Sequence, residues 1–439
     1  MELWQSAIVC SVPVRNSVSH CSECSRFAFL RFAAMPPPCP LRKCPFVSEL
    51  TDHAEVIRHL HRSPELFDRL AKATGKELGI QMKLRQDYPG DVVSAAIALR
   101  EIRAKVEGKF DNAAQLWLTR QAVEQSTAWQ IAQHKAKRFP TSELVLDLCS
   151  GIGMDSRALL QRGPVTAVDV DEAMSLRTTW NMQVWLPERI HEFQVLNEDA
   201  AATELTGMLI HADPDRRTKR DLPTKRLEQY RPDLTWMQTA VQEAKGGAIK
   251  LSPASNFMQK FPGCEIELIS FNGECREATV WFGELGSDIS FRATSLPTGE
   301  TLAANPLDAW CEQAESLNDF LFDPDPALVR SGLLDVFGEQ NSLQRLDPEE
   351  EYFTGATCPN SSFVTSFRIE AILPNNLTGL KKYLRKNPAS RCDVKCRRLK
   401  VDASQLQTKL PRGEGPVKVI FFLRVQGKVK IVVTERVNS

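Results

Sequence analysis

Residues 144–155 combine an acid with a glycine turn in a pattern that suits a small charged ligand. The segment reads Leu-Val-Leu-Asp-Leu-Cys-Ser-Gly-Ile-Gly-Met-Asp, so Asp147 stands four residues before Gly151. Gly151 and Gly153 would let a ligand approach the backbone closely, because neither carries a Cβ atom. A carboxylate at position 147 would repel a pyrophosphate, whereas it would accept a hydrogen bond from an ammonium group.

The turn differs from the dinucleotide-binding pattern Gly-x-Gly-x-x-Gly, because Ser156 stands where the third glycine belongs. It resembles the first motif of class I S-adenosylmethionine-dependent methyltransferases, whose cofactor carries an ammonium group. The alternative is a glycine-rich turn of another doubly wound protein. Under the first interpretation we predict that the cofactor-binding residues here are Asp147, Cys149, Gly151, Gly153 and Asp155. Asp155 is also placed to cap the helix that follows.

Three further acids follow strand-like segments. Asp169 ends the run 165–170, about 20 residues past the glycines, where a carboxylate can accept from ribose hydroxyls. Asp199 follows the run 191–195, and the resemblance implies contact with the adenine amino group. Asp213 ends a fourth run that begins at Gly207, and we predict that Asp169, Asp199 and Asp213 also bind the cofactor. Any one of these acids is more often a loop residue or a helix cap, but together they mark the edge where parallel sheets bind ligands.

The sequence Asp213-Pro214-Asp215-Arg216 lies where amino-methyltransferases place Asn/Asp-Pro-Pro followed by an aromatic residue. We predict these four residues to be catalytic. No aromatic residue follows, so methylation of an exocyclic amine loses its strongest local support. Arg216 and Arg217 can hold phosphate through paired hydrogen bonds. Alternatively, they pair with nearby acids and only order the loop.

Alternating strands and helices around these motifs predict an α/β fold. We expect a Rossmann-like sheet of seven strands that closes with an antiparallel pair around Asn272-Gly273. Residues 306–320 and 326–338 read as helices. From residue 362 onward, strands and helices alternate in the pattern of a small α+β domain.

Length and composition suit a globular protein of several domains. The chain has 439 residues, no net charge, 42% hydrophobic and 25% charged residues. We predict a disordered Cys/Pro-rich extension (1–48), a helical segment (49–140), a cofactor-binding domain (141–300) and an α+β domain (301–439). A zinc site in the extension is the weaker alternative, and we expect no metal in the catalytic site. No apolar run is long enough to span a membrane, and scattered cysteines indicate a cytoplasmic location. The oligomeric state is left undetermined.

The resemblance becomes specific over residues 66–437. The chain resembles bacterial class I methyltransferases that carry a C-terminal THUMP-like, ferredoxin-like domain. The matching segments are Glu124-Gln-Ser-Thr127, Asp147-Leu-Cys-Ser-Gly-Ile-Gly153, His211-Ala-Asp-Pro-Asp-Arg-Arg217, Tyr230-Arg-Pro-Asp233, Lys250-Leu-Ser-Pro253, Asp323-Pro-Asp-Pro-Ala-Leu328, Arg330-Ser-Gly332 and the closing strands. The resemblance implies that residues 125–127 cover the cofactor or touch the substrate; the alternative is a plain packing segment.

Domains of THUMP type imply an RNA substrate, such as rRNA or tRNA. Basic residues concentrate between 381 and 400, and a cluster of this kind can follow an RNA backbone. We therefore predict Arg217, Lys382, Arg385 and Arg398 to bind substrate; a solvated charged face is the alternative for the C-terminal three. The expected activity is S-adenosylmethionine-dependent RNA methylation. The alternatives are a noncatalytic scaffold of the same fold and methylation of a protein or small molecule.

Overall fold

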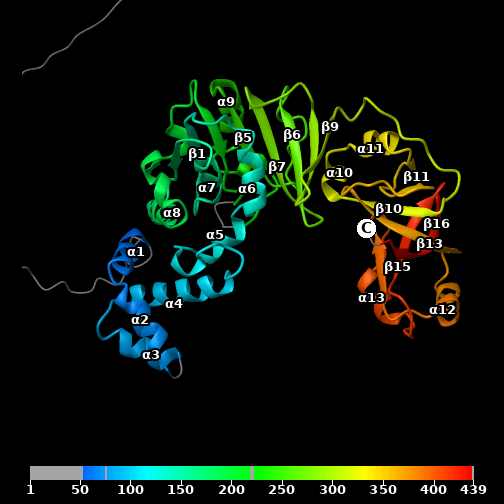
Figure 1. Ribbon diagram of the computed structural model, residues 1–439, viewed down its shortest axis with the longest axis horizontal. Coiled ribbons are helices and arrows are strands. Elements are labelled where there is room, and N and C mark those ends of the chain that lie inside the picture. Colours follow the sequence, from blue (N-terminus) through cyan, green and yellow to red (C-terminus); the bar gives the residue numbers. More distant parts are fainter. Residues whose placement is uncertain (1–52, 75–76, 218–221, 438–439) are drawn as a thin grey trace, which may run out of the picture. The chain divides into compact units, whose positions relative to one another are not determined.

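The computed structural model describes residues 53–74, 77–217 and 222–437 (Figure 1). The predictions for residues 1–48, disorder and the alternative zinc site, lie outside this part of the chain. The described chain begins with helices, of which α1 is amphipathic: Ala54, Ile57 and Leu60 are three residues apart and buried. These helices are α1 His53–His61, α2 Glu65–Lys72, α3 Glu77–Leu84, α4 Gly90–Lys105, α5 Arg120–Gln125 and α6 Trp129–Ala136, with the short η1 Ala113–Gln115 before α5.

A nine-stranded sheet follows, in the order β3-β2-β1-β4-β5-β7-β6-β8-β9. The first five of these strands are parallel neighbours, and β7 is antiparallel to both β5 and β6. The strands are β1 Val145–Leu148, β2 Val165–Val168, β3 Phe193–Leu196, β4 Leu209–Ala212, β5 Gly246–Leu251, β6 Glu265–Phe271, β7 Glu274–Gly283, β8 Phe291–Leu296 and β9 Glu300–Ala304. The α/β class with a parallel-rich sheet is confirmed.

The expected number of seven strands is corrected to nine. The first seven strands in the order are those we predicted, and β8 adds to their edge by pairing with β6 in parallel. A turn at Gly299, whose φ is +78°, then lets β9 pair with β8 in the antiparallel sense. A left-handed backbone of this kind suits glycine, because it lacks a Cβ atom.

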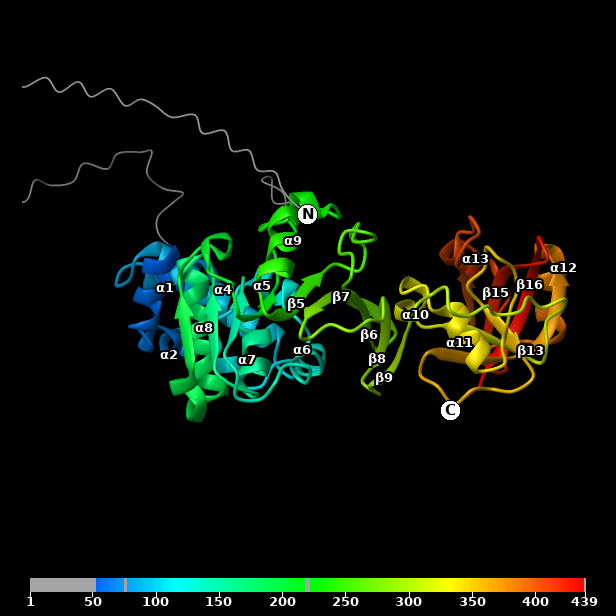
Figure 2. The same ribbon diagram turned by 90° about the horizontal axis from the view of Figure 1, so that it is seen from above.

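Helices cover both faces of the sheet, so the central strands are apolar at consecutive positions. Leu146 and Ile210 face the cluster that contains α9 (Leu234–Glu243). Val145 and Leu209 face the opposite cluster, formed with α6, α7 (Met154–Leu160) and α8 (Glu172–Trp185). Figure 2 shows α9 and α7 on opposite sides of the sheet. Short helices η2 Pro187–Glu192, η3 Ala200–Ala202 and η4 Leu227–Gln229 lie in the connections.

The C-terminal region forms a separate, mostly antiparallel sheet in the order β11-β12-β10-β13-β16-β15-β14. Its strands are β10 Phe320–Pro324, β11 Gln344–Arg345, β12 Phe353–Gly355, β13 Val364–Pro374, β14 Cys392–Cys396, β15 Lys418–Val425 and β16 Lys428–Arg436. Only β14 and β15 pair in parallel among the described strands of this sheet. Helices α12 Leu377–Lys386 and α13 Ala403–Lys409 pack on one face. This confirms the α+β class expected for this region.

The predicted helix over residues 306–320 is wrong. Leu307 and Trp310 are 97% and 72% exposed, whereas Cys311 is buried and its thiol lies 3.1 Å from the Leu343 carbonyl. Gln313 then bridges to Arg345 in parallel, so tertiary pairing holds the segment extended. The other predicted helix, 326–338, divides into α10 Pro326–Arg330 and α11 Leu334–Gln340. None of the helices in residues 53–74, 77–217 and 222–437 is long and apolar enough to cross a membrane.

Candidate active site

The turn between β1 and α7 carries three left-handed residues: Cys149 (φ 60°), Gly151 (φ 58°) and Gly153 (φ 87°). A Cβ atom on Gly153 would lie 2.7 Å from Cε of Met182 and 2.9 Å from Cγ2 of Thr178, so this position requires glycine. A Cβ atom on Gly151 would meet no atom within 4 Å among the described residues. The turn is therefore closed by α8 at Gly153 and open at Gly151, where a ligand can approach the backbone.

The prediction that Asp155 caps α7 is wrong. The helix begins at Met154 after Gly153, which places Asp155 in the first helical turn. Its side chain is buried, and Thr127 Oγ1 donates a hydrogen bond of 2.5 Å to Oδ2. Asp155 thereby joins a polar network beneath the turn instead of closing the helix end.

Two other predicted cofactor residues lie at the carboxyl ends of β2 and β3. Asp169 Oδ2 accepts from the Gly151 amide at 3.0 Å, and Oδ1 accepts from the Asp171 amide at 2.9 Å. Burial raises the pKa of Asp169 to about 6, although these two amides act in the opposite direction. Asp199 is exposed and accepts from the Ala201 amide at 2.9 Å. Both carboxylates thus lie at the edge where the predicted ribose and adenine contacts belong.

Asp147 is more buried than we expect for a residue that contacts the ammonium group of the cofactor. It is 1% exposed; Oδ1 lies 2.7 Å from His211 Nδ1, and Ser156 donates to Oδ2. Both carboxylate oxygens are thus engaged within the protein. Burial, with the acids Asp169, Asp213 and Asp147 nearby, raises the pKa of the neighbouring Cys149 thiol well above its usual value.

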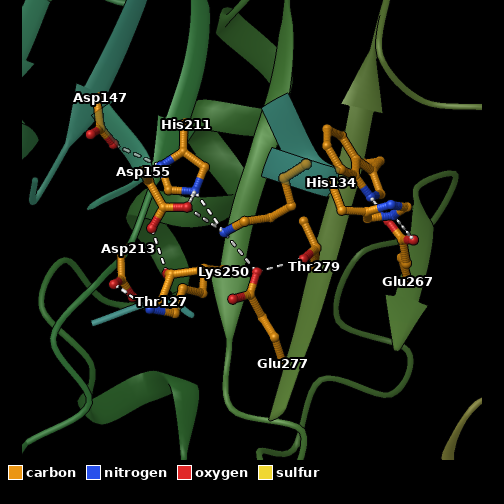
Figure 3. A network of polar contacts seen from close by, with 12 residues as sticks. Thr127, His134, Asp147, Asp155, His211, Asp213, Lys250, Glu267, Glu277 and Thr279 are labelled. Carbon is orange, nitrogen blue, oxygen red and sulfur yellow. Dashed lines mark hydrogen bonds and ion pairs between the residues drawn. The ribbon is translucent and has the colours of Figure 1, made fainter. Parts of the chain in front are cut away.

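His211 connects Asp147 to a buried lysine that the sequence interpretation missed (Figure 3). Lys135, 1% exposed, directs its ammonium at His211 Nε2 (3.0 Å), Asp155 Oδ1 (3.0 Å) and Glu277 Oε1 (2.7 Å). An ammonium can only donate, so Nε2 of His211 accepts and the ring proton lies on Nδ1, toward Asp147. Burial lowers the pKa of Lys135, but the Asp155 and Glu277 carboxylates more than offset this and raise it.

Asp213 and Lys250 form an ion pair beside this network (Figure 3), and their side chains are more exposed than those of Asp147, Asp155 and Glu277. Lys250 Nζ donates to Asp213 Oδ2 at 2.7 Å and to the Gln125 carbonyl at 3.3 Å. The side chains of Asp213 and Lys250 are 33% and 14% exposed, respectively. Burial lowers the pKa of Lys250, but Asp213, Glu277 and Asp155 outweigh it, so the pKa is raised and the group is an ammonium.

The loop after Asp213 borders a cleft of about 460 Å³. Backbone hydrogen bonds of 2.8 and 2.9 Å between Asp215 and Arg231 anchor this loop, and Pro214 is buried within it. The cleft is lined by Arg120, Gln121, Glu124, Gln125, Arg216, Arg217 and Pro223. Arg120 and Glu124 form an exposed ion pair of 3.2 Å. Arg216 and Arg217 therefore gather with an arginine from α5 that the sequence interpretation did not single out.

The C-terminal basic residues do not form one cluster. Lys382 and Arg385 are exposed on α12, which packs on one face of its sheet. Arg398, which follows β14, pairs with Glu351. Lys395 and Arg397 pair with Asp323 instead, and they line a separate cleft of about 880 Å³. Many of the positive charges in residues 391–400 are thus neutralised by acids of the same region.

Lys135 was not singled out from the sequence, and Lys250 was quoted only within the matching segment 250–253, without a role of its own. Lys135 follows Ile131 by four residues on the buried face of α6, and Lys250 interrupts the apolar strand β5. A charge on an apolar face requires a partner. The partners lie far away in the chain, so the pairs could not be assigned from spacing.

The chain is similar to known proteins over much of its length. A family model described as THUMP domain-like matches residues 364–436. Two uncharacterised S-adenosylmethionine-dependent methyltransferases of Mycobacterium tuberculosis, from strains CDC 1551 / Oshkosh and ATCC 25618 / H37Rv, are each 28% identical over 314 residues. The match covers 69% of this chain and 84% of each relative.

A crystal structure of a putative methyltransferase from Porphyromonas gingivalis W83 has the same fold. It superposes with a TM-score of 0.68 at 18% identity and covers 88% of this chain and 99% of that chain. The relatives, the fold and the glycine turn with its flanking acids agree with the resemblance drawn from the sequence. The protein is a class I S-adenosylmethionine-dependent methyltransferase with a C-terminal THUMP-like domain.

Proposed function

We propose that the protein methylates RNA, with the arginine-lined cleft receiving the strand next to Asp213. The observation that carries this proposal is the gathering of Arg120, Arg216 and Arg217 around one cleft. Guanidinium groups bind phosphate through two parallel hydrogen bonds, so three of them suit the successive phosphodiester groups of an RNA backbone. The THUMP-like match over residues 364–436 supports the same substrate class.

The residues of the turn fit S-adenosylmethionine. The space above Gly151 admits the cofactor, while Asp169 and Asp199 would hold its ribose and adenine groups. Bound there, the cofactor supplies an activated methyl group. The chain then has to align an acceptor atom with that methyl group, and alignment alone can contribute much of the rate.

Exposed positive charge on α12 supports a second contact with RNA. Lys382 and Arg385 lie outside the ion pairs that neutralise Arg397 and Arg398. We propose that these two residues strengthen binding without specifying sequence, as contacts to phosphate generally do.

The test is methyl transfer from tritiated S-adenosylmethionine to total RNA and to soluble protein, both from cells that lack this protein. We expect label in RNA, and its loss when Arg120 is replaced by Glu. Arg62→Glu, which changes an exposed arginine directly after α1, is the matched control. Label in protein but not in RNA would overturn the proposal.

A further inference from the structure

Asp213 is the carboxylate of the network that can meet a substrate. The side chains of Asp147, Asp155 and Glu277 are 1%, 10% and 2% exposed, whereas that of Asp213 is 33% exposed. Lys250 donates to Oδ2 of Asp213 at 2.7 Å, and none of residues 53–74, 77–217 and 222–437 donates a hydrogen bond to Oδ1. Asp213 is therefore the partly exposed carboxylate of the network, with one oxygen held by Lys250 and the other outside that contact.

Lys250 orients this carboxylate but cannot take up a proton. Its ammonium donates to Asp213 Oδ2 at 2.7 Å, and the negative charges of Asp213, Glu277 and Asp155 raise its pKa despite burial. Lys135 stands behind it and is likewise paired with Glu277 and Asp155. Of the two groups at the opening, Asp213 is thus the one that can act as a base.

The side chains that line the adjacent cleft suit a sugar-phosphate backbone better than a base. Its lining holds three arginines, two glutamines, a glutamate and a proline, with no aromatic ring among the described residues. A base extruded into an active site is usually held by stacking between aromatic or apolar side chains. Guanidinium groups match phosphate, and the glutamine amides match ribose hydroxyls.

We propose that the methylated atom is a ribose hydroxyl oxygen of the RNA backbone, with Asp213 as its proton acceptor and Lys250 as a positioning residue. This inference rests on the proposed RNA substrate and specifies which atom receives the methyl group.

The step balances with the groups present. The hydroxyl oxygen forms a bond to the methyl carbon, and the carbon–sulfur bond of the methyl donor breaks with its electron pair remaining on sulfur. The hydroxyl proton passes to Oδ1 of Asp213. Lys250 stays protonated throughout and holds Oδ2. The products are a methyl ether, a neutral thioether and a protonated Asp213, which returns its proton to water.

The position of the methyl group decides between a ribose and a base. Alkaline cleavage of RNA requires a free 2′-hydroxyl, so a methylated ribose leaves a labelled, alkali-resistant dinucleotide. We expect the tritium label in such dinucleotides. Label released as a base-methylated mononucleotide would overturn this inference while leaving the RNA proposal intact, and label found only in protein would overturn the RNA proposal itself.

A substrate change tests the same point with the protein unaltered. Once the labelled nucleotide is located, an oligonucleotide with 2′-deoxyribose at that position should bind within about twofold of its RNA counterpart, because the phosphate contacts remain. It should accept no methyl group. Methylation of the deoxy oligonucleotide at the parent rate would overturn the inference.

Asp213→Asn tests the proton acceptor, since an amide keeps the shape but takes up no proton. We expect kcat to fall by about 10²–10⁴-fold, the usual contribution of a positioned base, while RNA affinity stays within about twofold. Glu243→Gln, an exposed change on α9, is the matched control. Unchanged kcat in Asp213→Asn, with RNA binding retained, would remove Asp213 from this role.

Discussion

At the scale of single residues, the site depends on charges that are buried and fully paired. Lys135 has three ammonium protons and three acceptors, which come from three different elements: β4 (His211), α7 (Asp155) and β7 (Glu277). Such a group adds little net stability compared with an apolar core, but removing it leaves buried carboxylates unpaired. The ammonium of Lys135 thereby links the start of α7, directly after the glycine turn, to strands β4 and β7.

Lys135→Met should destabilise the protein by about 3–5 kcal/mol, because Asp155 and Glu277 would lose their shared cation. Urea unfolding of parent and variant measures this. Lys137→Met, an exposed change two residues along the chain, should alter the free energy of unfolding by less than about 0.5 kcal/mol. Equal unfolding midpoints for both variants would show that the buried ammonium contributes nothing.

Asp169 should make stability depend on pH. Burial raises its pKa from 3.8 to about 6 in the folded state, so the folded protein binds the proton more tightly than the unfolded chain. Stability therefore falls as pH rises from below 4 to above 6, by roughly 1 kcal/mol between pH 5 and pH 7. Urea titrations at these two pH values measure the fall. Asp169→Asn should remove the part of this fall that comes from Asp169. An identical dependence of the unfolding free energy on pH in the variant would contradict the raised pKa of Asp169.

At the scale of elements, the two glycines of the turn between β1 and α7 have different roles. Gly153 packs against Met182 and Thr178 of α8, whereas Gly151 faces open space. Both have positive φ values, but only Gly153 is confined by neighbours. One glycine therefore serves packing, and the other leaves room for the cofactor.

Gly153→Ala should cost more stability than Gly151→Ala. The left-handed backbone penalises both by about 1–2 kcal/mol, and the contacts of 2.7 and 2.9 Å add to the cost at Gly153. Urea unfolding compares the two variants, each serving as the control for the other. Equal losses of unfolding free energy in the two variants would mean that Met182 and Thr178 of α8 can move aside without a measurable cost.

Gly151→Val should abolish binding of S-adenosylmethionine, because its branched side chain would fill the space above the turn. Isothermal calorimetry on the folded variant measures this. An affinity equal to that of the parent would show that the cofactor does not occupy this turn.

Helix α12 presents two exposed cations whose contribution can be measured separately. Reversing the charge of Lys382 and Arg385 should weaken RNA binding and reduce the slope of log affinity against log salt by about 1.5, since each phosphate contact releases counterions. Arg398→Glu is the comparison, because Arg398 already pairs with Glu351. Parallel salt slopes for parent and double variant would identify α12 as a solvated face.

At the scale of the whole molecule, the two sheets share apolar and polar contacts. One buried cluster includes Leu268 of β6 together with Phe322 and Leu328 of the C-terminal region. Glu300 accepts hydrogen bonds from Ser361 and Ser362 at 2.6–2.7 Å. Contacts of this kind couple the unfolding of the two regions, because neither can open without exposing part of that cluster.

Phe421→Ala tests this coupling. Phe421 is fully buried in the C-terminal sheet, and its truncation should cost about 3–5 kcal/mol. Seven of the eight tryptophans precede residue 301, and Trp310 is 72% exposed, so the change in tryptophan fluorescence on unfolding reports mainly on the chain before the C-terminal region. The fluorescence midpoint in urea should nevertheless fall, whereas exposed Leu377→Ala should leave it unchanged. A midpoint unaffected by Phe421→Ala would show that the two sheets unfold independently.

The sequence by itself determined the features that depend on neighbours along the chain. Short apolar runs predicted the parallel strands, and the spacing from Gly151 to Asp169 predicted where that acid lies. These predictions succeed because a strand followed by a turn and a helix is encoded locally, and parallel strands bring their carboxyl ends to one edge. The α/β class, the cofactor and the THUMP-like region followed from the same local motifs.

Only the tertiary structure decided which charges meet. Lys135 and Glu277 are 142 residues apart and come together because α6 packs over the strands, and Asp155 enters their network instead of capping α7. Tertiary pairing also held residues 306–320 extended, added β8 and β9 to the main sheet and assigned Arg398 to Glu351. Pairing between distant segments leaves no periodic signal in the chain, because its energy comes from contacts that exist only after the fold has formed.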